Sequence, residues 1–384
     1  MNLTFLGRDA NLIQAFSLIF GMVVFLLSGF SANTIYLFIL LPALVFWVMI
    51  KPKLSTDGYI WLLYLLYVLF SSFWSNSDSI ELWNNAKYVL YVMIFLYALE
   101  LYKRSGLNVS YIFIGMFLSV LSIEVLSIGS YVFDHGVKSW FDQFPRLFGV
   151  IGVESPIDIS CVFVLSTIAL MACNKAKPLY CILGFLIVSV LISPFQTRIS
   201  ILGLGIGILV VFFQNKHMKM IFVSVGAAIF VMLLYYFGLD RFSSNEYTRL
   251  DIWQFAFDRL VEDCHMIYGC GFGYDFNINV SGRHYAQLHS LILSQFFYGG
   301  LLGFIAFSVV VIRTLWVLLK NDSPWFGVLV CSLVILMTNR HEIISNPNFV
   351  WVMLWVPIGL SGILFKKENI VCVDNNKMSM AHSI

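Results

Sequence analysis

Long runs of hydrophobic residues, separated by short polar stretches, dominate the hydropathy pattern of this chain. A helix needs about 20 apolar residues to cross the hydrocarbon core of a bilayer. On this scale the pattern predicts about twelve membrane-spanning helices joined mostly by short connections. The predicted spans are residues 12–30, 35–50, 59–74, 88–101, 109–132, 156–173, 178–193, 197–213, 220–238, 288–319, 324–338 and 349–365.

The composition indicates the same class of protein. Hydrophobic residues make up 60% of the 384 residues and charged residues only 11%, with a mean hydropathy of +0.86. Soluble domains contain roughly 45–50% apolar residues. The chain is therefore predicted to be an all-α polytopic membrane protein that forms one integral membrane domain over residues 1–384. The net charge of +2 gives no indication of a nucleic-acid partner.

Lysine and arginine residues gather at alternate connections between the predicted spans. The positive-inside rule places such connections in the cytoplasm. Both termini are then cytoplasmic, including a tail over residues 366–384, and the other connections face outward. The positive residues that define the pattern are Lys51, Lys53, Lys103, Arg104, Lys175, Lys177, Lys216, Lys219, Arg313, Lys320, Lys366 and Lys367.

The longest external connection, residues 239–287, joins the ninth and tenth spans and concentrates charge in an otherwise apolar chain. A connection of this length is more often functional than a simple link between helices. We therefore expect the chemistry of the protein in and beside this loop. Its charged residues and histidines, with the histidine that follows it, are Asp240, Arg241, Glu246, Arg249, Asp251, Asp258, Arg259, Glu262, Asp263, His265, Asp275, Arg283, His284 and His289.

Arg198 opens the predicted eighth span in the sequence Gln196-Thr197-Arg198. An arginine at the head of an apolar helix can simply extend its side chain to the membrane surface. Alternatively, its guanidinium holds the phosphate oxygens of an anionic headgroup through two parallel hydrogen bonds. Arg198 is therefore a candidate phosphate-binding residue, and Gln196 is a candidate supporting residue.

Arg249 lies where the external loop becomes rich in aromatic residues. Thr248 and Asp251 have the spacing of a capping box at a helix N-terminus. The pattern predicts a short amphipathic helix on the membrane surface, with Arg249 in its first turn. A solvated arginine on a surface helix is the alternative, but a cation in the first turn opposes the helix dipole, which indicates that another demand keeps it there. The apolar side chains that recur at helical spacing are Leu250, Trp253, Phe257 and Leu260.

Three alternating glycines follow in Gly269-Cys270-Gly271-Phe272-Gly273. Glycine permits backbone conformations closed to other residues, so we predict a tight turn that returns the chain over the site and acts as a hinge. Cys264 and Cys270 share this loop. A disulfide between them requires an oxidising compartment, and their spacing alone leaves the pairing open.

His289 lies in Gln287-Leu288-His289-Ser290, where the external loop re-enters the membrane. A histidine at this point is either a structural residue at the start of the helix or a general base. A base near neutral pH would take a proton from an attacking hydroxyl group. Its position at the mouth of a span makes His289 the candidate catalytic residue.

Four further charged residues are candidates for supporting roles. Arg340 and Glu342 lie in the last external polar cluster, and Arg146 lies in an earlier one. Glu124, inside the fifth span, is either a functional carboxylate or the partner of a buried cation. The sequence contains no set of ligands at zinc spacing and no phosphate-binding P-loop, which favours a site without metal or cofactor.

These motifs resemble those of the O-antigen polymerase and O-antigen ligase family of bacterial inner-membrane glycosyltransferases, over residues 145–320. The order of the motifs and the large loop between the ninth and tenth spans also match. Ser290 follows the histidine where the family often has asparagine, and Glu342 matches the late acidic residue of the family only loosely. The matching motifs are Gln196-Thr197-Arg198, Thr248-Arg249-Leu250, Gly271-Phe272-Gly273, Leu288-His289 and Gly299-Gly300-Leu301-Leu302-Gly303.

The resemblance implies a fold similar to that of GT-C-type transferases, which use lipid-linked sugars. It implies an enzyme of the inner membrane whose active site faces the periplasm and whose substrates are undecaprenyl-diphosphate-linked oligosaccharides. Arg198 and Arg249 would bind the donor diphosphate, and His289 would deprotonate the attacking sugar hydroxyl, with inversion at the anomeric carbon. Membrane lipid, a chain-length regulator and a flippase are the other partners that it implies.

The motifs do not separate a polymerase of O-antigen or capsule repeat units from a ligase. A ligase passes the finished glycan to lipid A-core, and both enzymes need the same arginine and histidine chemistry. We expect a polymerase, because polymerases are the more numerous and more divergent group. A flippase of the same lipid-linked units is the alternative of another class, but it predicts charges around a central cavity and short loops on both sides.

Overall fold

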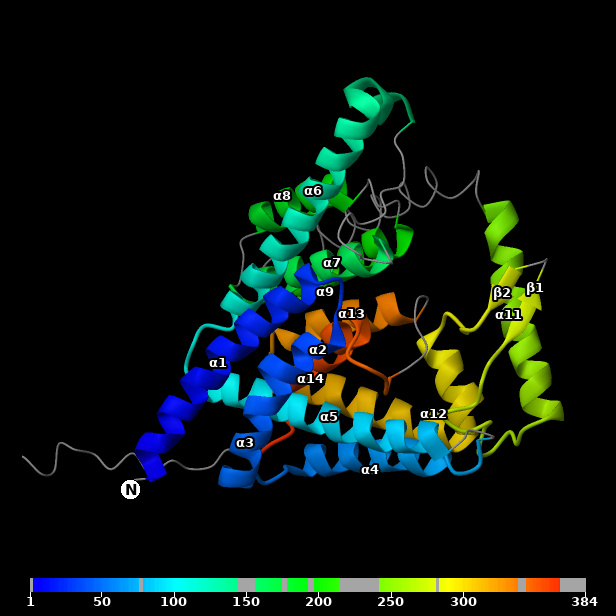
Figure 1. The fold of residues 1–384 in the computed structure, drawn as a ribbon, viewed down its shortest axis with the longest axis horizontal. Coiled ribbons are helices and arrows are strands. Elements are labelled where there is room, and N and C mark those ends of the chain that lie inside the picture. Colours follow the sequence, from blue (N-terminus) through cyan, green and yellow to red (C-terminus); the bar gives the residue numbers. More distant parts are fainter. Residues whose placement is uncertain are drawn as a thin grey trace, which may run out of the picture.

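The computed structural model describes residues 3–75, 79–143, 156–174, 178–192, 197–214, 242–280, 283–337 and 343–366, and the described chain is predominantly helical (Figure 1). Every predicted span except the ninth coincides with a described helix; the ninth, residues 220–238, lies outside the described residues. The helices are α1 (Leu3–Leu27), α2 (Ala32–Ile35) continued by a π-helical turn η1 (Tyr36–Leu40) and α3 (Leu41–Ile50), α4 (Thr56–Ser71), α5 (Ser79–Arg104), α6 (Ser110–Gln143), α7 (Pro156–Cys173), α8 (Pro178–Ile192), α9 (Arg198–Gln214), α11 (Phe242–Glu262), α12 (Leu291–Lys320), α13 (Trp325–Leu336), and a π-helical turn η3 (Trp351–Trp355) continued by α14 (Val356–Ser361).

The lengths and surfaces of these helices show a membrane-embedded protein. Within the described residues, three helices are long and apolar enough to cross a membrane: Ala32–Ile50, Ser110–Val137 and Leu291–Lys320. Shorter apolar helices lie beside them. On α8, Ile187 and Val190 are 57% and 69% exposed. Large apolar surfaces of this kind are rare on soluble monomers, because water disfavours them.

Two helices form the centre of the bundle and are shielded from lipid. All residues from Val92 to Tyr102 in α5 are buried, as are all from Trp351 to Leu360 in η3 and α14. The two helices approach closely at Gly359, where a Cβ atom would lie 2.4 Å from Leu99 Cδ1. A helix that is apolar on all sides is stable only when other helices surround it, and this arrangement satisfies that condition.

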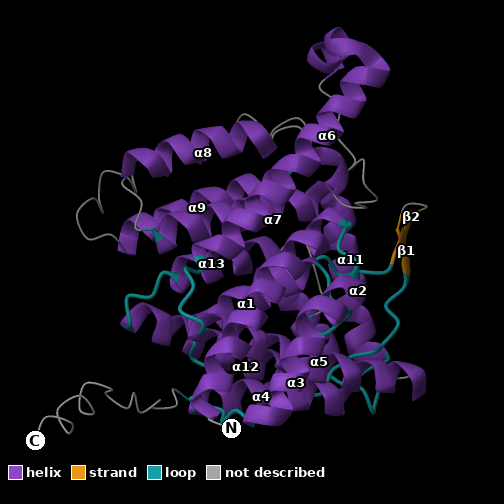
Figure 2. Cartoon of the chain, turned by 60° about the vertical axis from the view of Figure 1, so that its left-hand side comes forward, coloured by secondary structure: helices purple, strands orange, loops and turns teal. Residues whose placement is uncertain are grey.

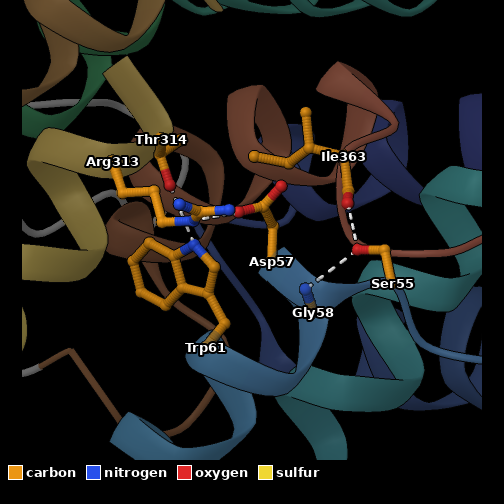
Figure 3. A network of polar contacts seen from close by, with 7 residues as sticks. All are labelled: Ser55, Asp57, Gly58, Trp61, Arg313, Thr314 and Ile363. Carbon is orange, nitrogen blue, oxygen red and sulfur yellow. Dashed lines mark hydrogen bonds and ion pairs between the residues drawn. The ribbon is translucent and has the colours of Figure 1, made fainter. Parts of the chain in front are cut away.

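The start of α4 is bound to the end of the last helix (Figure 3). The Gly58 amide donates to Ser55 Oγ at 3.0 Å, which caps α4, and the Ser55 hydroxyl donates to the Ile363 carbonyl. Lys103 Nζ donates to the Ser361 carbonyl at 3.1 Å from the end of α5. Three helix ends therefore meet at one end of the bundle.

The same end of α4 is also bound to α12. Arg313 Nε lies 2.5 Å from Asp57 Oδ1, and Trp61 Nε1 donates to Thr314 Oγ1 at 3.0 Å (Figure 3). The indole contact is buried, so its hydrogen bond does not compete with water. These contacts fix the second half of α12 against α4.

Helix α12 changes direction at Gly300, which has φ 60° and ψ −163° (Figure 1). Its 30 residues would extend about 45 Å as one straight helix, whereas Leu301–Lys320 alone extends about 30 Å, the thickness of the hydrocarbon core. The predicted tenth span of residues 288–319 is therefore too long. The segment Leu291–Gly299 is a separate helical part that precedes the span, and only Ser290 separates it from His289.

Several predicted boundaries differ from the observed ones for one reason. Helix α5 begins at Ser79 within the predicted loop 75–87, and α6 continues to Gln143 within the predicted loop 133–155, with a break at Gly136. Hydropathy detects only the apolar part of a helix. These helices continue beyond it because their backbone hydrogen bonds do not require apolar side chains.

Candidate functional site

His289 lies at the start of α12 in an unusual backbone conformation. Its φ of 51° is in the left-handed region, which non-glycine residues seldom adopt. The preceding Leu288 is fully buried, and the following Ser290 caps the helix by accepting a hydrogen bond from the Leu293 amide at 3.4 Å. These neighbours hold the partly buried His289 beside the positive end of the helix dipole. Strained backbone of this kind is often found at functional sites.

Tyr285 is a further neighbour of His289. The two rings meet edge to face with centroids 6.4 Å apart. Tyr285 ends strand β2 (Arg283–Tyr285), which pairs with β1 (Ile278–Val280) in an antiparallel hairpin (Figure 2). This hairpin was not predicted from the sequence. The alternation of polar and apolar residues over 276–280, followed by Ser281-Gly282, was the signal that would have predicted it.

Arg249 lies within α11 rather than at its start. The helix begins at Phe242, so Thr248 is an internal helical residue and the predicted capping box is wrong. Arg249 is therefore not in the first turn, and its predicted opposition to the helix dipole there is wrong as well. The local pattern failed because the mostly polar segment 242–248 extends the helix by two turns without an apolar stripe.

The side chain of Arg249 is exposed and makes no hydrogen bond or ion pair with any described residue. Arg259, ten positions along the same helix, differs: its guanidinium pairs with Asp263 and lies 5.2 Å from the centre of the Phe255 ring. Hydrogen bonding to Asp263 raises the pKa of Arg259 above its usual range. Among the described residues, no carboxylate competes with an external anion for Arg249.

Trp253 connects the helix of Arg249 to the segment of His289. Its indole Nε1 donates to the Leu288 carbonyl at 3.0 Å. Arg249 and Trp253 are four residues apart on one helix, so their side chains lie on the same face, with Cβ atoms about 6 Å apart. The arginine and the histidine, 40 positions apart in the sequence, therefore belong to one region of the structure. From the sequence, Trp253 was predicted only to belong to an apolar stripe.

An aromatic cluster supports the same contact between α11 and α12. Phe276 is buried, and its ring centroid lies 6.1 Å from that of Phe255 on α11 and 5.4 Å from that of Phe297 on α12. Ile252 and Leu260, on the inner face of α11, are also buried. Burial of such side chains stabilises the arrangement by roughly 1.5–3 kcal/mol for each fully buried side chain.

Replacing Trp253 with phenylalanine should loosen the segment that carries His289. The substitution keeps an aromatic ring but removes the donor to the Leu288 carbonyl, and one such hydrogen bond contributes about 1 kcal/mol. Amide hydrogen exchange over residues 286–293 should become faster. Trp83→Phe, at a position 72% exposed, is the control and should leave this segment unchanged. Equal exchange in both variants would contradict the connection.

The glycine-rich turn has the predicted tight geometry but is not free to act as a hinge. Gly269 and Gly271 have φ of 76° and 86°, and a Cβ atom at Gly271 would lie 2.5 Å from the Ser71 carbonyl oxygen. The Phe272 amide donates to Ser71 Oγ at 3.2 Å, and Asn85 Nδ2 donates to the Phe272 carbonyl at 3.1 Å. The turn is therefore docked against the ends of α4 and α5.

The turn also replaces hydrogen bonds that the break at Gly300 removes from α12. The carbonyls of Phe297 and Tyr298 would normally accept from amides four residues later. Here the Cys270 amide donates to the Phe297 carbonyl at 2.9 Å, and the Gly271 amide donates to the Tyr298 carbonyl at 2.8 Å.

The amides on the other side of the break are paired in the same way. Leu301 donates to the Met266 carbonyl at 2.9 Å, and Leu302 donates to the Ile267 carbonyl at 3.1 Å. Cys264 and Cys270 form a disulfide across this loop, with Cα atoms 4.9 Å apart, which answers the question that spacing left open. The disulfide loop is thus a structural support for the broken helix.

Arg198 is the first residue of α9, and the position of its side chain lies outside the described part of the chain. Its neighbour Thr197 donates to Ser160 Oγ of α7 at 2.8 Å, and Ser160 Oγ lies 2.8 Å from Ser200 Oγ. All three hydroxyls are buried. Helix α9 packs mainly on α13 and α7, whereas α11 packs on α12 and β1, so Arg198 and Arg249 are positioned by different neighbours.

Glu124 is buried in α6 with 1% of its surface exposed, and neither carboxylate oxygen has a hydrogen-bond partner among the described residues. Phe117, two turns earlier on the same helix face, stacks on Phe163 of α7 with ring centroids 4.6 Å apart. Glu124 therefore faces the beginning of α7. The remaining candidates, Arg146, Gln196, Arg340 and Glu342, lie outside the described residues.

No group of three or more histidine, cysteine, aspartate or glutamate side chains among the described residues could hold a metal ion. The described site instead offers a cationic side chain, an imidazole, a helix N-terminus and several aromatic rings. These groups suit an anionic ligand and a proton transfer.

Comparison with known proteins gives no closer assignment. No protein-family model matches the chain, and a search of curated proteins finds no significant match.

Proposed function

We propose that the protein is a polymerase of surface-polysaccharide repeat units. It transfers the growing glycan from undecaprenyl diphosphate to a lipid-linked repeat unit, by the fold and mechanism that the sequence motifs imply. The observation that supports this most directly is the hydrogen bond from Trp253 to the Leu288 carbonyl, which joins the helix of Arg249 to the segment of His289. Anion binding and base catalysis, the two requirements of the transfer, are thus available in one region.

In the proposed reaction, an acceptor hydroxyl oxygen bonds to the anomeric carbon while the bond from that carbon to the diphosphate oxygen breaks. The configuration at this carbon inverts. The His289 imidazole takes the proton of the hydroxyl. Arg249, together with Arg198, compensates the negative charge that develops on the departing lipid diphosphate. The N-terminus of α12 adds a partial positive charge beside His289.

Two features of α4 support a site on the periplasmic face of the inner membrane. The end of α4 near Ser55 meets the cationic end of α5, where Arg104 donates to the Lys366 carbonyl at 3.0 Å. The opposite end of α4 holds the loop with the Cys264–Cys270 disulfide through Ser71. Positive residues favour the cytoplasm and disulfides favour oxidising compartments, so both signals indicate the same orientation, with both termini in the cytoplasm.

Two other functions use the same described features. A ligase that transfers the glycan to lipid A-core needs the same arginine and histidine. A flippase is favoured by one observation: the buried Glu124 has no hydrogen-bond partner in the described part of the chain, and intramembrane carboxylates often lie on transport paths. The exposed position of Arg249 on an external helix favours transfer over transport.

The proposed function is tested with purified protein in nanodiscs, supplied with lipid-linked repeat units and EDTA. The wild type should produce a ladder of longer lipid-linked glycans. Arg249→Gln should lose most of the ladder, because a glutamine side chain cannot compensate the charge of the diphosphate.

Arg259→Gln is the matched control, because Arg259 is exposed on the same helix but already paired with Asp263. It should retain the ladder. No ladder from the wild type, with transfer of a preformed glycan to added lipid A-core, would identify a ligase. Translocation of the repeat unit without either product would identify a flippase and contradict the proposal.

A further inference from the structure

Six large apolar side chains form one exposed surface at the end of α4 and on the disulfide loop. We call this surface the loop patch. Its residues, between 43% and 65% exposed, are Phe70, Phe73, Trp74, Met266, Ile267 and Tyr268. The two parts meet at Trp74 and Tyr268, whose ring centroids are 6.2 Å apart. Exposing six such side chains to water would be unfavourable, so the loop patch is expected to contact something other than water.

The loop patch continues the apolar outer face of α12. The amides of Leu301 and Leu302 donate to the carbonyls of Met266 and Ile267, so the loop lies directly against the first turn of the span. Leu301 and Leu302 are 47% and 45% exposed, and Ile305, one turn further, is 49% exposed. Since α12 is one of the three helices suited to cross the membrane, this exposed face contacts lipid. The patch extends that contact beyond the end of the helix.

The backbone of the loop is compatible with an environment poor in water. The amides of Tyr268 and Gly269 donate to the His265 carbonyl at 3.1 and 2.6 Å, and the Ile267 amide donates to His265 Nδ1 at 3.2 Å. The Met266 and Ile267 carbonyls are paired with α12. Irregular backbone enters the apolar part of a membrane only when its polar groups are satisfied within the protein. The amides of Ile267, Tyr268 and Gly269 and the carbonyls of Met266 and Ile267 meet that condition.

The chemistry of the side chains indicates how deep the loop patch lies in the membrane. Tryptophan and tyrosine concentrate at the boundary between headgroups and acyl chains, where the ring is shielded and its polar atom reaches water. Trp74 and Tyr268 form such a pair, and the charged residues Arg259 and Asp263 precede the loop at the exposed end of α11. The charges thus lie outside the patch and the apolar residues within it.

We propose that the loop patch inserts into the outer leaflet at the boundary between headgroups and acyl chains, and that lipid is its partner. The disulfide loop is then a membrane contact rather than part of the water-exposed external loop. Because the loop also pairs with α12 on both sides of Gly300, its insertion fixes the height of the first part of α12, and of His289, above the membrane. This inference does not depend on the proposed reaction.

The test uses the photoreactive residue p-benzoylphenylalanine in the full-length protein, reconstituted in nanodiscs of phosphatidylethanolamine and phosphatidylglycerol. The residue replaces Ile267 in one variant and Phe73 in another. A third variant carries it at Asn279, which is exposed on strand β1. After irradiation, mass spectrometry should find several-fold more phospholipid adduct at positions 267 and 73 than at 279.

Phe73→p-benzoylphenylalanine replaces one exposed aromatic ring with another, so it tests the patch even if the change at Ile267 disturbs the loop. Equal lipid adduct at all three positions would overturn the proposal. Lipid adduct at position 73 but not at position 267 would also overturn it, if the Ile267 variant keeps its fold. The disulfide loop would then lie above the membrane. Adducts with a second copy of the chain in place of lipid would identify a protein interface and equally overturn it.

Discussion

Replacing His289 with asparagine should slow glycan transfer by about 100- to 10,000-fold, the usual contribution of a general base. Asparagine is the informative substitution because it tolerates the left-handed backbone that φ of 51° imposes at this position. The fold should therefore remain intact while the base is lost. The measurement is the initial rate of ladder formation with saturating lipid-linked substrate.

His284→Asn is the control for this experiment. His284 is an exposed histidine on β2, five positions before His289, and should be replaceable without loss of rate. His289→Ala adds backbone strain to the loss of the base, so its melting temperature should be lower than that of His289→Asn. A His289→Asn variant with the rate of the wild type would show that His289 is only a structural residue at the start of α12.

Replacing Gly300 with alanine should disrupt both the break in α12 and the loop that supports it. A Cβ atom at Gly300 would lie 2.4 Å from the Gly269 nitrogen and 2.4 Å from the Ile267 carbonyl oxygen. Its φ of 60° and ψ of −163° belong to a region that is essentially restricted to glycine and costs about 1–3 kcal/mol for other residues. We expect a melting temperature lower by several degrees and transfer slower by about 100-fold, since small displacements of catalytic groups have effects of this size.

Gly205→Ala provides the matched comparison. An added Cβ atom there meets nothing within 4 Å in α9, and alanine favours a helix over glycine by about 1 kcal/mol. This variant should be as stable as the wild type or more so. If Gly300→Ala behaved in the same way, the close contact between the disulfide loop and α12 would not be required.

The positions of the helices were largely predictable because each apolar run must be long enough to cross the membrane. The predicted spans 156–173 and 178–193 agree closely with α7 (Pro156–Cys173) and α8 (Pro178–Ile192). The prediction was less accurate where a helix continues into polar sequence, as in α11, which begins at Phe242. Hydropathy measures the preference of a side chain for lipid over water. It does not indicate where the backbone hydrogen bonds of a helix end.

The candidate site was predictable in its chemistry but not in its assembly. Arg249 and His289 were recognisable as unusual residues from their local sequence. Their connection was not, because it depends on the hydrogen bond from Trp253 to Leu288, 35 positions away. Arg198 opens α9 as predicted.

The sequence by itself determined the membrane-embedded helical class, the approximate place of the described helices and the residues with suitable chemistry. These properties depend on side chains that are close together in the sequence, within about one helical turn or one membrane span. The tertiary structure alone decided that α12 breaks at Gly300 and that the disulfide loop supplies the lost hydrogen bonds. A break in a helix is stable only if its free carbonyls and amides find partners, and here those partners lie about 30 positions earlier in the chain. Local sequence patterns carry no information about pairing over that distance.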